Sequence, residues 1–285
     1  MSLWSRDEHR IVLQKNQVLL VTGRRELTVH GVRRHVQAKQ VLSCSSVDGN
    51  AGTGEKQWDG ALATLESALP ALAKRNSHAT VILSNHFMRY ALIPRSEALS
   101  DEKEELSFAR HSFREMYGSA ADSWELRINH EQTGTAAQVA CAVDTRLLTA
   151  LRESFGRMGI KLQSVQPHLM LAYNSCQRLL NGRSAWLVLV ERDNLCLALL
   201  RDGEWAWVRT IRTGVRWREG LPFFLERETY LTNTDPTTSD VFIWAPDHQD
   251  EAMPCSCRWQ FKYLQPQPVS GLVPEQDRRF AMYMN

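Results

Sequence analysis

The chain has 285 residues, of which 43% are hydrophobic and 23% charged, and its formal net charge is +2 at pH 7. This composition excludes wholesale disorder, and the length is sufficient for two domains. The small net charge excludes a strong overall field for nucleic acid or acidic lipid. No apolar run reaches the ~18 residues of a membrane span, so we expect no membrane span. No apolar stretch of the kind found in a signal peptide follows the charged residues 6–10. We therefore expect a cytoplasmic chain without a secretory signal.

The first part of the chain predicts three strands, a helix and a further extended segment. The strands are short apolar runs at residues 10–15, 17–22 and 41–47. In the helix that follows, one face carries Leu62, Leu65, Leu69 and Leu72, and Pro70 is expected to kink it. Residues 81–94 then predict either one bent strand or a pair of strands.

The middle of the chain predicts an inserted α-β-β-α piece at about residues 101–158. Asp101 and Glu104 suit a capping box at the start of its first helix, and Gly118 is expected to end that helix. Two strands follow, and Asp144 then caps a second helix that ends at Gly159. These strands cover residues 124–130 and 137–143. A strand at 161–166 and a helix from Pro167 to Gly182 complete the first half.

The second half repeats the opening order of elements. Three strands are predicted, and the Asp202-Gly203 pair is a strong hairpin signal between the last two. The strands are Ala185–Val190, Leu195–Leu200 and Trp205–Ile211. A helix at 222–232 and strands at 241–244 and 259–264 follow. A β-β-β-α-β unit that occurs twice predicts two related lobes, at residues 1–182 and 183–285.

One stretch of the sequence, from Val81 to Asn174, carries an ordered set of short segments typical of a known family. They are Leu92-Ile93-Pro94, Glu104-Glu105-Leu106, Phe108-Ala109-Arg110, Tyr117-Gly118, the strand ACAVD at 140–144, Met158-Gly159-Ile160-Lys161-Leu162, Ser164-Val165, Pro167 and Leu171-Ala172-Tyr173. In this order the stretch resembles type IV pilus assembly proteins of the PilM type and the cytoplasmic domains of type II secretion GspL proteins. Both belong to the actin-like ATPase superfamily.

The resemblance implies an α/β fold of two RNase H-like lobes, of which the first carries the inserted piece. It also implies a cytoplasmic adaptor or scaffold at the inner-membrane face, which binds the cytoplasmic tail of an inner-membrane pilus or secretion assembly protein. A groove in the first lobe beside residues 101–158 is the expected place for that tail, by strand pairing. A pilus or secretion ATPase is a further expected partner. Some members of the superfamily bind ATP between the lobes.

The turns that would hold a nucleotide lack the residues that the resemblance requires. Actin-like proteins use Asp-x-Gly turns, in which the carboxylate holds hydrated Mg²⁺ and glycine lets backbone amides reach the phosphates. Here the corresponding turns are Gln14-Lys15-Asn16-Gln17, Glu191-Arg192-Asp193-Asn194 and Ala245-Pro246-Asp247. We therefore expect no enzyme, no catalytic, cofactor or metal residues and no ATP hydrolysis. The alternative is an active or weakly ATP-binding protein that uses Glu191 or Asp193 for Mg²⁺.

Two further segments have a conceivable binding role. Residues 49–56 resemble a P-loop in position, but Glu55 interrupts the spacing and Gln57 replaces the required Ser or Thr, so a surface loop is expected. A cluster of arginines and tryptophans comprises Arg209, Arg212, Arg216, Arg218, Trp205, Trp207 and Trp217. It leaves three readings open, namely an acidic protein partner, nucleic acid or no special role, and we expect no nucleic acid.

The remaining polar groups favour structural explanations. The cluster of Arg24, Arg25, Arg33 and Arg34 is typical of a solvated edge hairpin. Cys255 and Cys257 follow His248, but a second spaced ligand pair for zinc is missing. His86 and His111 have no triad partners in a recognised order. The acidic residues at 101–105 suit the start of a helix.

Overall fold

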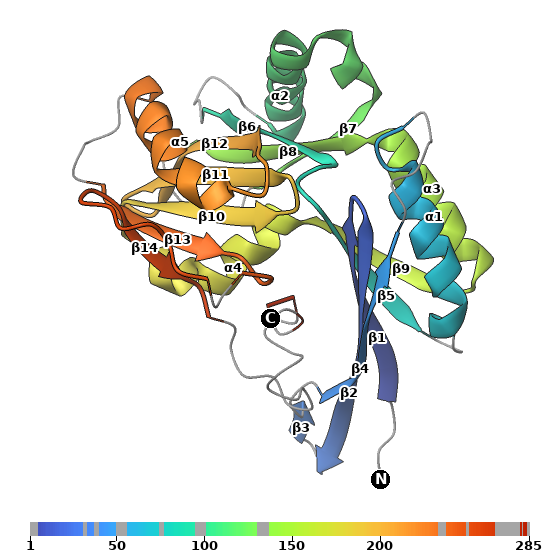
Figure 1. The fold of residues 1–285 in the computed structure, drawn as a ribbon. Coiled ribbons are helices and arrows are strands. Elements are labelled where there is room, and N and C mark those ends of the chain that lie inside the picture. The colour runs from blue at the N-terminus through green and yellow to red at the C-terminus, as the bar shows by residue number, and fades with distance from the viewer. Residues whose placement is uncertain are drawn as a thin grey trace. The chain divides into compact units, whose positions relative to one another are not determined.

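The computed structural model describes residues 5–30, 33–36, 40–49, 56–73, 77–94, 101–129, 137–232, 238–248, 251–265, 280 and 282–283. The chain divides into two compact units (Figure 1). Unit 1 comprises Met1–Phe87, Arg146–Leu171 and Gln265–Asn285, and unit 2 comprises Met88–Thr145 and Ala172–Leu264. This division differs from the predicted limits at 182 and 183, because most of the inserted piece groups with the second lobe and the C-terminal segment groups with the first.

Unit 1 is built on a six-stranded sheet with the order β3-β2-β1-β5-β9, in which β4 also pairs with β2. The strands are β1 (Ser5–Gln14), β2 (Gln17–His30), β3 (Arg33–Val36), β4 (Gln40–Asp48), β5 (His78–Leu83) and β9 (Lys161–Pro167). On one side of β1 the pairing is antiparallel, through β2, and on the other it is parallel, through β5 and β9. The predicted edge hairpin of basic residues is the β2–β3 pair.

Helices of unit 1 cover the sheet through their apolar faces. Helix α1 (Asp59–Ala68) ends before Pro70 and continues as the 3₁₀ turn η1 (Leu69–Leu72), which confirms the predicted interruption. Helix α3 (Thr145–Arg157) lies beside α1 (Figure 1), and its Ser154 hydroxyl donates to Glu66 at 2.6 Å. Helix α4 (His168–Leu180) begins in unit 1 and ends in unit 2.

Unit 2 contains a second sheet with the same plan. Its order is β12-β11-β10-β13-β14, with antiparallel pairs around β11 and parallel pairs from β10 to β14. The strands are β10 (Ala185–Glu191), β11 (Asn194–Arg201), β12 (Glu204–Arg212), β13 (Asp240–Trp244) and β14 (Gln260–Tyr263). The equal order of strands in the two sheets confirms the predicted repeat and the RNase H-like architecture.

A separate three-stranded sheet forms the inserted piece of unit 2, with the order β6-β8-β7. Its elements are β6 (Met88–Ile93), α2 (Glu102–Tyr117), the 3₁₀ turn η2 (Gly118–Ser123), β7 (Trp124–Ile128) and β8 (Gln138–Asp144). The predicted limits of 101–158 therefore need correction at both ends. Segment 81–94 is a pair of strands, and its second strand joins this sheet. Helix α3 groups with unit 1 instead, and its Ser154 and Arg157 side chains donate to Glu66 of α1.

Local signals place the ends of α2 correctly but not the start of α5. Asp101 accepts hydrogen bonds from the backbone amides of Lys103 and Glu104, and Gly118 ends α2 with φ of 67°. Helix α5 (Trp217–Leu231) begins well before the predicted residue 222 and contains Pro222 in its interior. Burial of one helix face explains this, because it stabilises a longer helix than the local proline signal indicates. The buried residues include Trp217, Leu221 and Leu225.

The last described residues of the chain belong to the core of unit 1. Phe280 and Tyr283 pack in a cluster with residues of β1, β2 and β5, and the Arg10 guanidinium donates to the carbonyl of Tyr283 at 2.8 Å. The Tyr283 ring also lies 5.2 Å from that of His168. This location was not predictable from the sequence, because the local pattern of these residues does not indicate the sheet on which they pack.

The β11–β12 hairpin depends on a glycine that no other residue can replace without strain. Asp202 and Gly203 have φ of 54° and 84°, as a two-residue hairpin turn requires. A Cβ at position 203 would lie 2.4 Å from the backbone nitrogen of Gly182. We predict that Gly203→Ala lowers the free energy of unfolding by about 2–4 kcal/mol in chemical denaturation.

Gly214→Ala is the matched control in the same unit, because a Cβ there meets nothing within 4 Å and φ is not in the left-handed region. Equal unfolding midpoints for the two variants would contradict the predicted clash.

Candidate functional site

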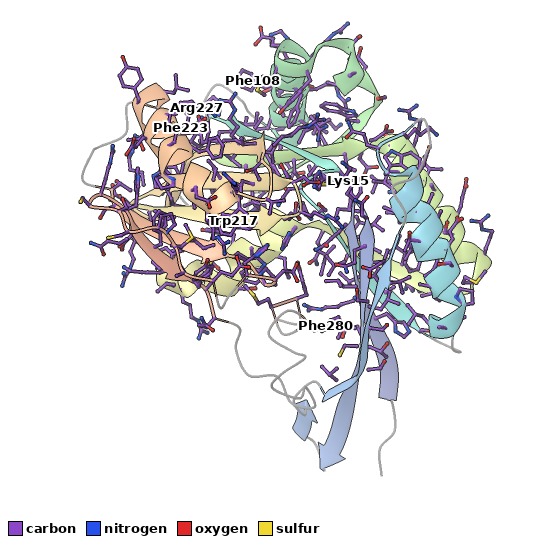
Figure 2. All side chains as sticks on the ribbon, in the orientation of Figure 1. Lys15, Phe108, Trp217, Phe223, Arg227 and Phe280 are labelled. Atoms are coloured by element: carbon purple, nitrogen blue, oxygen red, sulfur yellow. The ribbon has the colours of Figure 1, made fainter. Side chains whose placement is uncertain are left out.

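The first turn that could face a phosphate lies at the tip of the β1–β2 hairpin. Gln14 and Gln17 form the last pair of the ladder, so Lys15 and Asn16 make a two-residue turn (Figure 2). The Asn16 carbonyl accepts a hydrogen bond from the Gly49 amide at 2.9 Å. The turn is the one predicted from the sequence, and it presents side chains where an actin-like turn presents a carboxylate and bare backbone.

The second turn, between β10 and β11, has the predicted residues but directs its carboxylate inward. Glu191 pairs with Asn194, which leaves Arg192 and Asp193 as the turn, with φ of 60° at Asp193. The Glu191 side chain is only 8% exposed, and its negative charge adds to the effect of burial in raising the pKa of Cys196. A carboxylate on this buried face is poorly placed to hold hydrated Mg²⁺.

The third turn, residues 245–247, follows β13, and the next residue, His248, contacts Glu251, which lines a pocket of about 510 Å³. Arg218, Glu219, Glu251 and residues 252–254 line the pocket. Arg218 contacts Glu251, and the His248 Nδ1 lies 3.3 Å from the same carboxylate. Glu251 thereby offsets the positive charge of Arg218, so the pocket offers little net attraction for a phosphate.

Burial lowers the pKa of His248, the nearby Asp247 acts in the opposite direction, and Arg218 lowers the pKa again. Because the ordinary pKa of histidine is already about 6.5, the ring is neutral at pH 7. His248 is therefore a packing group beside Trp217, whose ring lies 5.6 Å away, and not a cationic phosphate ligand.

The tryptophans of the predicted arginine–tryptophan cluster point into the protein. Trp205 is 3% exposed and packs on Tyr173 with 4.5 Å between ring centroids. Trp217 is 4% exposed in the core under α5, and Trp207 packs against Trp186 at 6.1 Å. A surface for stacked bases requires accessible rings, whereas Trp205 and Trp217 are buried and Trp207 is partly buried.

The arginines of the same cluster separate into different environments. Arg209 lies 3.4 Å from Glu228, which is completely buried, and Arg218 contacts Glu251. The other two are exposed. The sequence grouped these residues because they follow one another along β12 and the next turn, whereas the fold divides them between ion pairs and solvent.

Most other predicted candidates have structural roles. His111 lies 3.4 Å from Glu115 on the exposed side of α2, and the acidic start of α2 forms its cap as predicted. The P-loop-like segment lies mostly outside the described residues, which resume at Lys56. In the described part of the chain, groups of three or more His, Cys, Asp and Glu side chains that could hold a metal are absent. No helix there is long and apolar enough to cross a membrane.

Burial divides the cysteine thiols into unreactive and reactive groups. Burial raises the pKa of Cys141 to about 11 and that of Cys176 to about 12, and it raises the pKa of Cys196 well above its usual value. Cys255 and Cys257 are exposed. Since the thiolate is the reactive form, the buried thiols are protected by both protonation and inaccessibility.

We predict that iodoacetamide at pH 8 alkylates Cys255 and Cys257 in the native protein and spares the buried Cys176 and Cys196 and the partly buried Cys141. All six cysteines should react in guanidinium chloride, and mass spectrometry of peptides distinguishes the two patterns. Rapid labelling of Cys196 in the native state would show that the β10–β11 core opens readily.

The arrangement of these sheets and turns agrees with that of several solved structures. The PilM–PilN type IV pilus biogenesis complex aligns over 96% of this chain and 95% of that chain, with 13% identity and a TM-score of 0.65. The chain has the actin-like fold. A Bacteroides thetaiotaomicron protein described as having an actin-like ATPase fold and unknown function aligns over 84% of this chain and 81% of its own, with 11% identity and a TM-score of 0.53.

A third structure of similar fold is the cytoplasmic domain of EpsL, an inner-membrane component of the type II secretion system of Vibrio cholerae. It aligns over 98% of this chain and 93% of its own, with 11% identity and a TM-score of 0.56. No family model and no curated protein sequence matches the chain. The actin-like fold is therefore shown by structure, while the turns that usually hold its nucleotide are altered.

Proposed function

We propose that the chain is a non-catalytic adaptor in type IV pilus or type II secretion assembly. In this role it acts at the cytoplasmic face of the inner membrane and binds the cytoplasmic tail of an inner-membrane partner, with an assembly ATPase as a further partner. Two observations support the proposal. Both PilM–PilN and EpsL align over almost the whole chain, and both are parts of such machines by their descriptions.

The absence of catalysis is proposed from the turns of the described chain. The β1–β2 turn offers Lys15 and Asn16 in place of Asp and Gly, and the β10–β11 turn offers Arg192 and Asp193. Backbone amides that approach a phosphate need residues without bulky side chains. The buried position of Glu191 is the single observation that carries this part of the proposal, because that residue stands where the Mg²⁺ carboxylate is needed.

Strand β7 offers a place for an extended tail. It forms the end of the β6-β8-β7 sheet, and the backbone amide of Asn129 donates to the Val139 carbonyl of β8 at 3.0 Å. Antiparallel pairs alternate between hydrogen-bonded and non-hydrogen-bonded positions. The amides of Leu126 and Ile128 therefore point away from β8, toward the edge where a tail can pair.

The catalytic part of the proposal is tested with Mg-ATP. We expect isothermal titration to give no binding in the micromolar range and a phosphate-release assay to give no turnover, because the phosphate contacts are missing. The Glu191→Ala variant serves as the control for residual activity. Turnover in the parent chain that this variant abolishes would refute the non-catalytic proposal and favour an active member of the superfamily.

The adaptor part is tested with synthetic cytoplasmic tails of the inner-membrane pilus and secretion proteins encoded in the same genome. One of these tails should bind in fluorescence anisotropy. Ile128→Pro should weaken it by about fivefold or more, since it removes one outward amide whose hydrogen bond contributes about 1 kcal/mol. Ile128→Val retains that amide and should bind normally. If no tail binds the parent chain, the adaptor proposal fails.

A further inference from the structure

Two exposed cysteines, Cys255 and Cys257, lie two residues apart in the segment between β13 and β14. Cysteine is among the residue types that proteins bury most often, and Cys176 and Cys196 of this chain follow that rule. Ser256, between the two exposed cysteines, is only partly exposed. This alternation indicates that both thiols are presented to solvent on the same side of the segment.

Contacts on both sides of the cysteine pair hold its segment against the core of unit 2. Before the pair, Met253 packs against the core cluster that contains Trp217 and Trp259. After the pair, Trp259 is 3% exposed. The Ser256 hydroxyl accepts hydrogen bonds from the backbone amides of Arg258 at 3.2 Å and Trp259 at 3.0 Å. The backbone that carries the two thiols is therefore held in place by the fold itself.

The spacing of the pair suits one soft metal ion between the two sulfur atoms. Because the chain advances at most ~3.6 Å per residue, the Cα atoms of Cys255 and Cys257 are separated by no more than ~7 Å. Both thiols can therefore reach the same ion. Thiolate sulfur is a soft ligand of the kind that selects Cu(I), and Cu(I) accepts two thiolates in a near-linear arrangement.

Zinc fits the pair less well than Cu(I), because a structural Zn²⁺ site takes four ligands. Within the described ranges, groups of three or more His, Cys, Asp and Glu side chains that could hold a metal are absent. His248 precedes the pair in the chain, but its ring lies beside Trp217 and its Nδ1 is 3.3 Å from the Glu251 carboxylate. A two-coordinate ion requires no further ligand, so the two thiols are sufficient for Cu(I).

We propose that Cys255 and Cys257 bind one Cu(I) ion as a pair of thiolates. Binding displaces the two thiol protons, forms two S–Cu bonds and leaves the copper in its +1 state. The proposal departs from the expectation of no metal residues, which rested on the missing second ligand pair for zinc. It also goes beyond the adaptor proposal, because the cysteine segment precedes β14 and lies outside the β6-β8-β7 sheet that offers an edge to the tail.

The test is a competition for Cu(I) between the full chain and the chromogenic chelator bicinchoninate, without oxygen and with ascorbate to keep the copper reduced. The folded chain should remove one equivalent of copper from the chelator. A synthetic peptide of residues 251–259 has the same thiols without the fold, and it should bind about tenfold more weakly or worse, because its backbone is not held in place. Equal affinities of chain and peptide, or no removal of copper by the chain, overturn the proposal.

Variants assign the copper to the pair. Cys255→Ser and Cys257→Ser should each weaken binding by about 100-fold or more, because a single thiol loses the advantage of two linked ligands. Cys44→Ser is the matched control, since it removes a partly exposed thiol of unit 1, and it should bind like the parent chain. Thermal unfolding checks that each variant is folded. Parent-like affinity in either of the first two variants refutes the assignment.

Alkylation distinguishes bound copper from a disulfide. One equivalent of Cu(I) should protect Cys255 and Cys257 from iodoacetamide, and excess bicinchoninate should restore their alkylation. Protection that withstands the chelator and is reversed only by dithiothreitol would identify a disulfide and contradict the metal site. The binding of a membrane-protein tail is measured on the copper-free chain, so failure of this inference and failure of the adaptor proposal are separable.

Discussion

Each of the two sheets depends on one central strand that pairs in opposite senses on its two sides. Strand β10 is buried along its whole length, and Ile11, Val12 and Leu13 of β1 have no exposed surface. Because such a strand has no face in contact with solvent, other elements of the chain must pack on both faces of its sheet. The β1–β2 and β10–β11 turns are thereby fixed at the carboxyl ends of these strands, where open α/β sheets bind their ligands.

The central strands also fix the positions of the β1–β2 and β10–β11 turns. Because the strands hold these turns at one edge of each sheet, the side chains in the turns decide whether a phosphate can approach the backbone there. Side chains of Lys15 and Arg192 stand where an actin-like protein offers backbone, and Glu191 faces a buried layer beside Cys196. The strand order of the actin-like fold is therefore kept, while the residues of these turns differ from an Asp-x-Gly pattern.

The buried Glu228 is the second organising interaction, in unit 2. An isolated buried carboxylate is strongly unfavourable, so its two arginine contacts stabilise the packing of α5 against β12. Those contacts also hold Arg209 and Arg227 at the surface in a defined geometry.

The sequence by itself determined the order of the elements, the repeated lobe plan, the composition of the turns and several ends of helices, such as the Asp101 cap and the Gly118 stop. These features depend on residues a few positions apart, whose backbone preferences act locally. Only the tertiary structure decided that 81–94 splits between two sheets, that α5 starts at Trp217, that α3 leaves the inserted piece and that Tyr283 packs on β1. It also decided that Glu191 faces inward and that the arginines of β12 and the following turn lie in different environments. Contacts between segments that are distant in the chain set the direction of each side chain, and the local sequence pattern carries no information on those contacts.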